Sequence, residues 1–230
     1  MGQGSALSSI LSALYLAPVL HILERYLKNL KIPVSILSFV DDGLFIAQSK
    51  TLTISSSYLF CSYNIASLLL EKFELIMEYG KMEVFHFSGS HGTFDPPSLD
   101  LFILDGPILC SRETWKYIDF IFNRKLSFHQ HVNFYTNKSI STVKYMKILG
   151  NSSCSLVPYQ KRLLYRSCIL LITLYSFHLW FYNKMLLSYP LNKLRKMQRR
   201  VAIWITYTFQ ILPSWGIKAI ASLIPIHLYL

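Results

Sequence analysis

The sequence predicts an α+β protein in two parts: residues 1–124 combine helices with short antiparallel strands, and residues 125–230 form helices only. Apolar residues recur at helical spacing over several long segments. In the first part, short runs rich in β-branched and aromatic residues, bounded by turn residues, separate these segments. The chain has 230 residues, of which 52% are hydrophobic, so it can bury a sizeable core, and this excludes a disordered protein.

The first part begins with an apolar helical pattern from Ser5 to about Lys31, in which Pro18 is expected to introduce a kink. Pro33 ends this helix. A second helix is expected over residues 51–77, because its apolar residues lie on one stripe and its charged residues largely off it. The strands expected after it are Met82–Phe87, Leu101–Leu104 and Trp115–Phe122, with Ser88–Pro97 as a loop.

Between the first two helices, the sequence predicts a β-hairpin. Two β-rich runs, Val34–Val40 and Leu44–Ala47, flank the tripeptide Asp41-Asp42-Gly43. Gly43 can take the positive φ that a tight turn demands. We therefore expect both carboxylates at the tip of the hairpin.

Beyond about Lys125 the pattern is mostly helical. We expect helices near residues 127–149, 158–186, 191–209 and 216–223, separated by Pro158, Pro190 and Pro213. Within residues 191–201, the apolar residues form one stripe: Leu191, Leu194, Met197 and Val201. The basic residues of this stretch lie mostly away from it: Lys193, Lys196, Arg199 and Arg200.

The formal charge of +11 is concentrated in one region. Residues 111–200 hold 16 Lys and Arg against Glu113 and Asp119, a net charge of +14, while the rest of the chain carries −3. Such an excess favours a polyanionic partner such as a nucleic-acid backbone, and a solvated helix face is the alternative. The cysteines have no metal-ligand spacing, so we expect buried free thiols in a reducing compartment: Cys61, Cys110, Cys154 and Cys168.

Two apolar segments raise the alternative of a membrane protein. Ser5–Leu23 contains serines and a proline and has no preceding basic residues, unlike a signal peptide. Cys168–Tyr182 has 15 residues, and about 20 are needed to cross a bilayer. We expect both segments to be buried core helices and the protein to have no membrane partner.

Two explanations compete for Asp41 and Asp42. Adjacent carboxylates repel each other unless a cation neutralises them, and Mg²⁺ prefers such oxygen ligands together with substrate phosphates. The alternative is a solvated turn, since Asp-Gly is a common turn sequence. The pair by itself favours the turn, and the apolar flanks and the basic region downstream shift the balance toward the metal site.

Four motifs resemble those of reverse transcriptases. Phe39-Val40-Asp41-Asp42 resembles the family's aromatic-x-Asp-Asp hairpin, and Gly2–Leu11 is similar to its Gln-Gly-Ser segment. Gly80–Ser88 resembles the Lys-x-Glu strand, and Trp115–Val132 the tyrosine-leucine-glycine strand with its D-x-x-L-x-F-x-x-H continuation. Their order and spacing are most similar to the polymerases of fungal non-LTR (LINE-type) retrotransposons, and the resemblance continues over Arg162–Tyr165 and Leu194–Trp204.

The resemblance implies the carboxyl-side half of a polymerase palm over residues 1–124 and a basic, helical, thumb-like region over 125–230. It implies that Asp41 and Asp42 bind Mg²⁺ and that Lys81 donates a proton to pyrophosphate. Gln3, Gly4 and Ser5 would line the template and nucleotide pocket. The implied partners are an RNA template, a DNA primer and a dNTP, with the nucleic-acid backbone held by Lys193, Lys196, Arg199 and Arg200.

The sequence also departs from the family. The family's principal metal-binding aspartate lies upstream of the Gln-Gly-Ser segment, and this sequence begins at Met1. We therefore expect an amino-terminally truncated polymerase that is inactive alone. Gly2, Met82 and Asp119 stand where the family has Pro, Thr and Gly, which agrees with decay.

Two other functions stay open: a non-catalytic module that binds an RNA or DNA backbone, and, last, a membrane-associated helical protein. An intracellular location is expected, in the nucleus or cytoplasm, with the mitochondrion also open. The oligomeric state does not follow from the sequence.

Overall fold

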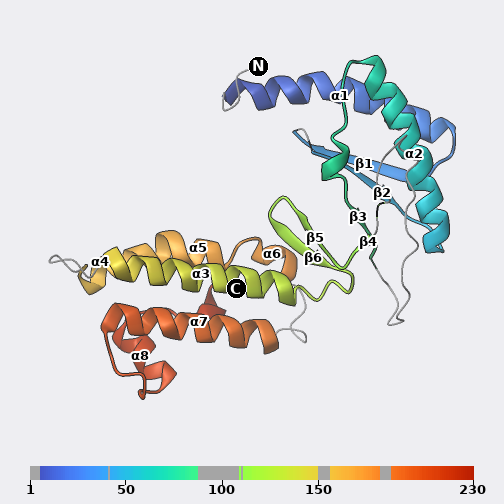
Figure 1. The fold of residues 1–230 in the computed structure, drawn as a ribbon. Helices are drawn as coiled ribbons and strands as arrows, with labels where there is room; N and C mark the ends of the chain where they lie inside the picture. The colour runs from blue at the N-terminus through green and yellow to red at the C-terminus, as the bar shows by residue number, and fades with distance from the viewer. Residues whose placement is uncertain (1–5, 41, 88–108, 110, 150–155, 182–187) are drawn as a thin grey trace. The chain divides into compact units, whose positions relative to one another are not determined.

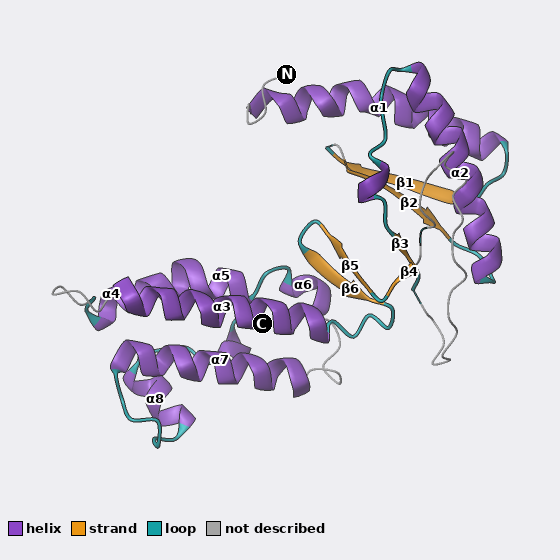
Figure 2. Ribbon diagram, in the orientation of Figure 1, coloured by secondary structure: helices purple, strands orange, loops and turns teal. Residues whose placement is uncertain are grey.

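The computed structural model describes residues 6–40, 42–87, 109, 111–149, 156–181 and 188–230 (Figure 1). The chain divides into two compact units, Met1–Glu113 and Thr114–Leu230. Helices and short strands occur together, which confirms the α+β class (Figure 2). The units divide before the boundary predicted at residue 124, because a hairpin over residues 114–123 packs on the helical core through Phe120 and Phe122.

The first unit contains a hairpin with two helices packed on one of its faces. β1 (Val34–Phe39) and β2 (Asp42–Ala47) pair antiparallel. The helices are α1 (Ala6–Asn29) and α2 (Leu52–Lys72). Their buried residues Leu23, Leu27 and Ala66 form a small core with three inward residues of the hairpin, Val34, Ile36 and Phe45. Because alternate strand residues point to opposite faces, this packing fixes the hairpin register.

α1 differs from the buried core helix that the sequence predicts. Val19 is buried, whereas Ile10, Leu11 and Leu14 are exposed. Among the described residues, the segment Leu7–Asn29 is long and apolar enough to cross a membrane, and 11% of its most apolar window is buried. Core helices and signal sequences can meet the same criterion, so the absence of a membrane partner stays a prediction.

α2 ends earlier than predicted, at Lys72 instead of residue 77. Glu74 takes a left-handed conformation with φ of 57°, and the N–H of Leu75 donates to the Leu70 carbonyl, as in a helix-terminating Schellman turn. The chain then forms a 3-10 helix, Tyr79–Lys81, and a short strand, β3 (Val84–Phe85), which pairs in parallel with β4 (Ser111–Arg112). The expected strand 101–104 and loop 88–97 lie outside the described residues.

The second unit begins with a hairpin where the sequence predicts one strand. β5 (Thr114–Tyr117) and β6 (Phe120–Asn123) pair antiparallel. Ile118 and Asp119 form the turn with φ of 46° and 62°. Two successive positive φ values are those of a type I′ turn, which matches the twist of hairpin strands.

Helices form the rest of the second unit. α3 (His129–Leu149) contacts both α5 (Leu170–Thr173) and α7 (Ser188–Thr206) (Figure 1). The remaining helices are α4 (Pro158–Leu164), a π-helical turn (Tyr165–Ile169), α6 (Phe177–Trp180), α8 (Ser214–Ile220) and a 3-10 turn (Ile226–Leu228).

Two sequence expectations for these helices are wrong. The predicted helix 158–186 is interrupted at Ser176, which takes φ of 52°. Pro190 does not separate two helices but lies in the first turn of α7. Proline is tolerated there because the first N–H groups of a helix have no intrahelical acceptor.

The core of the second unit lies between its helices and includes fully buried Tyr165, Ile169, Leu194 and Trp204. Gln198 ties the end of the chain to this core. Its side-chain amide donates to the Tyr165 hydroxyl (3.2 Å) and to the Ile224 carbonyl (2.6 Å), and its Oε1 accepts from the Ile226 N–H (3.1 Å). Burial raises the pKa of Tyr165 to about 12.

The described cysteines are free thiols, as predicted, but Cys61 is exposed and Cys168 is half-buried. The expectation of burial is therefore wrong for Cys61. Cys110 and Cys154 lie outside the described residues.

Candidate functional site

The first candidate site is the tip of the β1–β2 hairpin. Phe39 pairs with Asp42, so the strands are joined by a tight turn that begins at Val40. Asp42 is exposed at the start of β2, and Asp41 lies outside the described residues. The predicted strand-turn-strand unit is therefore confirmed, with Asp42 next to its turn.

The turn differs from the prediction in the residue that takes the positive φ. Val40 has φ of 59°, while Gly43 lies within β2 opposite Ser38. The register explains this change, because the inward packing of Ile36 and Phe45 sets which residues pair. A β-branched residue is unfavourable in this region, so the hairpin tip is strained.

The described part of the chain does not complete a metal site at this tip. No group of three or more His, Cys, Asp and Glu residues gathers there or elsewhere in that part. Asp42 is the one predicted ligand that the structure describes. A single exposed carboxylate does not fit the donor set that a two-metal centre requires, so Mg²⁺ binding stays a prediction.

Of the other predicted catalytic and nucleotide-binding residues, the structure describes Lys81. Lys81 lies in the 3-10 helix Tyr79–Lys81, not on the predicted strand. Its ammonium group forms an ion pair with Glu78 at 2.5 Å, and both side chains are exposed. Gln3, Gly4 and Ser5 lie outside the described residues.

The second candidate site is the basic face of α7. Leu194, Met197 and Val201 are buried, as the apolar stripe predicts. Lys193, Lys196 and Arg200 are exposed. Such exposed cations can contact phosphate groups without reading a base sequence.

Arg199 differs from these cations, because it is half-buried and bound to the protein. Its Nη2 donates to the carbonyls of Gln210 (2.5 Å) and Leu212 (3.0 Å), and its Nη1 donates to Ser214 Oγ (2.8 Å). The guanidinium therefore holds the loop between α7 and α8. This engagement leaves it less available to a phosphate than the exposed cations.

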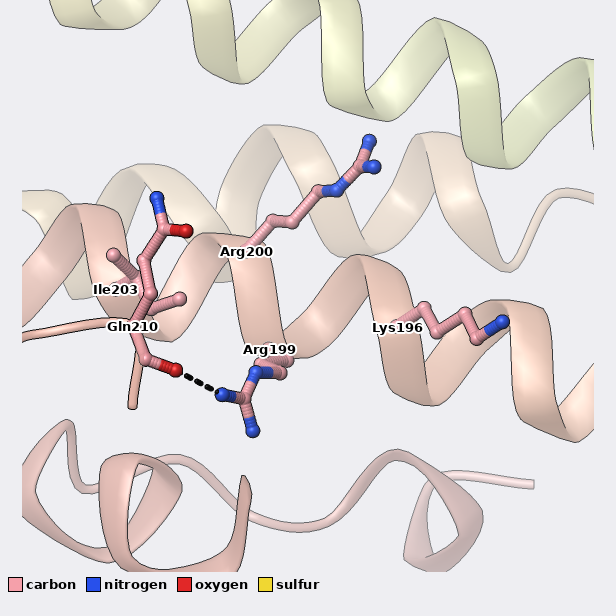
Figure 3. A pocket seen from close by; sticks show the side chains of 5 residues that line it. All are labelled: Lys196, Arg199, Arg200, Ile203 and Gln210. Atoms are coloured by element: carbon pink, nitrogen blue, oxygen red, sulfur yellow. Dashed lines mark hydrogen bonds between the residues drawn. The ribbon is translucent and has the colours of Figure 1, made fainter. Parts of the chain in front are cut away.

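A concavity of about 410 Å³ lies beside this arginine. Figure 3 shows the side chains that line it, four from α7 and one from the loop: Lys196, Arg199, Arg200, Ile203 and Gln210. Three of the five are cationic. Arg199 is bound to the loop, so Lys196 and Arg200 are the lining cations that are exposed to an anion.

The charge of the second unit also favours an anionic ligand. Residues 114–230 contain 16 Lys and Arg and one acidic residue, Asp119. Asp119 pairs with Lys116 at 2.7 Å, and this hydrogen bond lowers the pKa of the carboxyl group. Few carboxylates are therefore present to neutralise the exposed cations of this unit.

Lys161 is one of the 16 Lys and Arg counted in residues 111–200, but it is fully buried. Its Nζ donates to the Trp204 carbonyl at 3.4 Å and lies 3.6 Å from the centre of the Tyr207 ring. This position stabilises the end of α7 and excludes contact with a phosphate. The signal was present in the sequence, since Lys161, Tyr165 and Ile169 recur every four residues and all are buried.

His131, the histidine of the D-x-x-L-x-F-x-x-H resemblance, has a structural position that sequence reasoning did not assign. Its Nδ1 accepts from the Ile121 N–H at 3.2 Å, so its Nε2 is the protonated nitrogen and donates to the Tyr175 carbonyl at 3.2 Å. The ring stacks on Phe120. His131 therefore joins β6, α3 and the segment after α5.

Comparisons with protein-family models, with curated proteins and with solved structures gave no match. The family resemblance therefore rests on the motifs of the sequence itself. The structure adds the hairpin and the basic helical unit as features against which that resemblance can be tested.

Proposed function

We propose that this chain is a part of a reverse transcriptase of the non-LTR retrotransposon type. The ancestral reaction is RNA-templated DNA synthesis from dNTPs. The observation that carries the proposal is the series of four motifs in family order, with Asp42 at the start of the second of two antiparallel strands. A polymerase needs carboxylates that can meet a metal-bound nucleotide, and the Asp42 side chain is exposed.

In this proposal, α1, α2 and the β1–β2 hairpin correspond to the carboxyl-side part of a palm, and the helical unit corresponds to a thumb. The exposed cations of α7 support the second assignment, since a thumb contacts the backbone of the primer-template duplex. The β5–β6 hairpin belongs to the thumb-like unit, since Phe120 packs in its core.

We expect the 230 residues alone to be inactive. Two-metal catalysis clamps both the attacking and the leaving oxygen, and it needs more carboxylates than Asp41 and Asp42 supply. No third carboxylate joins Asp42 in the described part of the chain.

Primer extension tests this expectation directly. The full chain is given an RNA template, an annealed DNA primer, dNTPs and Mg²⁺, with Asp41→Asn as the matched variant. We expect neither protein to extend the primer. Extension by the wild-type chain that is lost in Asp41→Asn would show an active polymerase and overturn the expected inactivity.

The second candidate is a non-catalytic module that binds a nucleic-acid backbone. The single acidic residue among 16 basic ones in residues 114–230 favours it. Backbone contacts release counterions, so the affinity for an RNA–DNA duplex should fall steeply as salt rises, with a log–log slope close to −0.9 per phosphate contacted, by the value for B-DNA. An affinity that does not change with salt would exclude this function.

A further inference from the structure

The loop between α7 and α8 presents large apolar side chains to solvent. Phe209 is 83% exposed, Ile211 is 95% exposed and Trp215, in the first turn of α8, is 77% exposed. Single exposed apolar residues are common in proteins, whereas these three lie within seven positions of one loop and its following helix turn.

The backbone of this loop is nevertheless held in place. The Arg199 guanidinium binds the carbonyls of Gln210 and Leu212 and the hydroxyl of Ser214. These three acceptors alternate with the exposed residues along the chain. Anchoring the backbone reduces the entropy that the loop would lose on binding a ligand.

The same loop forms one wall of the cationic concavity. Gln210 lines it together with four residues of α7: Lys196, Arg199, Arg200 and Ile203 (Figure 3). Phe209 and Ile211 are the sequence neighbours of Gln210. Exposed aromatic and apolar residues therefore flank, along the chain, a residue that lines the cationic concavity.

We propose that this surface binds an unpaired strand of RNA or DNA, with phosphates in the concavity near Lys196 and Arg200 and bases stacked on Phe209 and Trp215. The inference rests on the proposed contact with a nucleic-acid backbone. It specifies that the preferred ligand at this surface is a single strand and not a duplex. Base faces are accessible in a single strand, whereas in a duplex they are covered by their stacked neighbours.

An anionic bilayer is the competing occupant, because cations and apolar side chains also bind membrane surfaces. The concavity favours the strand. A bilayer presents its headgroup phosphates on a broad, nearly flat surface, while a flexible strand can place one phosphate inside a concave site.

Fluorescence anisotropy with the full chain tests the proposal. The probes are a labelled single-stranded RNA of about 12 nucleotides, within the length that one single-strand site covers, and the same strand in a duplex. We expect the single strand to bind more tightly. Phe209→Ala and Trp215→Ala should each weaken it about tenfold, since one stacked base is lost. The matched control Tyr145→Ala, an aromatic residue of α3 that is 70% exposed, should leave the affinity unchanged.

Conservative variants separate stacking from general hydrophobic contact. Trp215→Phe keeps a ring face and should bind like the wild type, whereas Trp215→Leu should weaken binding as Trp215→Ala does. Circular dichroism checks that the variants stay folded. We expect this because the Phe209 and Trp215 side chains are highly exposed.

Four results would overturn the inference. Tighter binding of the duplex, or unchanged single-strand affinity in Phe209→Ala and Trp215→Ala, would contradict it and leave the proposed function standing. Loss of binding to anionic vesicles in Trp215→Ala, with RNA affinity unchanged, would assign the surface to a membrane. Failure to bind either nucleic acid would contradict both this inference and the proposed nucleic-acid contact.

Discussion

At the scale of single residues, the cations of the helical unit fall into two kinds. Lys161 is enclosed by Trp204 and Tyr207, and Arg199 is bound to the α7–α8 loop. Lys196 and Arg200 are exposed on α7. A buried cation stabilises the fold through its contacts, whereas an exposed cation is available to a ligand, so identical charges in the sequence have different functions.

Arg199 and Arg200 give the sharpest test of this division. Arg199→Ala should lower the free energy of unfolding by about 1–3 kcal/mol, because it leaves the Gln210 and Leu212 carbonyls without their charged donor. Arg200→Ala should leave stability within about 0.5 kcal/mol of the wild type and should reduce the salt dependence of nucleic-acid binding by one phosphate contact.

Urea denaturation and salt-titrated anisotropy measure the two effects. The division would be wrong if Arg200→Ala destabilised the protein as much as Arg199→Ala does. Arg199→Lys serves as the control for charge, since lysine keeps the cation but not the planar fork of donors.

His131 makes stability depend on pH. Burial lowers the pKa of His131 below its ordinary value of 6.5, and the hydrogen bond to the Tyr175 carbonyl opposes this in part. The folded state therefore keeps the ring neutral at a pH where the unfolded state binds a proton. The contribution of the neutral His131 ring to stability is fully present above pH 6.5. It is lost as the pH falls through the lower pKa of the folded state.

Urea unfolding at about pH 7.5 and about pH 5 should reveal this loss, at about 1.4 kcal/mol for each unit by which the pKa is lowered. His131→Gln can still accept from the Ile121 N–H but does not titrate, so it should reduce the pH dependence. His178→Gln, at an exposed position, is the control. An unchanged pH dependence in His131→Gln would exclude this explanation.

At the scale of elements, the β1–β2 hairpin carries both strain and uncovered surface. Val40 is β-branched and takes φ of 59°. On the face away from α1 and α2, Leu37, Phe39 and Ile46 are exposed. An isolated two-stranded sheet is marginally stable, so this hairpin depends on the helices that cover its other face.

Val40→Asn should relieve the strain at the turn. Asparagine tolerates the left-handed region, so we expect an increase of about 1 kcal/mol in the stability of the first unit. Hydrogen exchange at the amides of β1 and β2 measures the change locally. Ser38→Asn, within β1, is the control. It should not stabilise the hairpin, since asparagine is disfavoured in strands. Faster exchange in Val40→Asn would contradict the assigned backbone conformation.

At the scale of the whole molecule, the two units differ in how well they are packed. The helical unit has an extensive core around Tyr165, Leu194 and Trp204. The first unit, residues 1–113, buries Leu23, Leu27 and Ala66 in one small cluster and Val84 in another. Since burial of apolar surface is the main source of stability, the helical unit should be the more stable of the two.

A fragment of residues 114–230 should therefore fold alone and bind an RNA–DNA duplex with the affinity and salt dependence of the full chain. Circular dichroism and salt-titrated anisotropy compare the two proteins. A folded fragment with a much weaker salt dependence would mean that the first unit supplies essential phosphate contacts.

Local features of both units were predictable from the sequence. The apolar stripe of α7 and the hairpin at residues 34–47 follow from residue spacing, because periodicity acts over a few residues. The Asp-Gly turn preference indicated a turn in this segment but placed it too late, since Asp42 and Gly43 lie in β2. The resemblance supplied the remaining site residues, and of these the structure describes Asp42, Lys81 and the cations of α7.

Only the tertiary structure decided which surfaces are covered. It buried Lys161, engaged Arg199 with the loop, exposed the first half of α1, and joined the β5–β6 hairpin to the helical core. The physical reason is that a residue's spacing specifies its face on a helix or strand, while its burial depends on partners distant in the chain. The same distant packing set the register of the β1–β2 hairpin and so placed the positive φ at Val40 instead of Gly43.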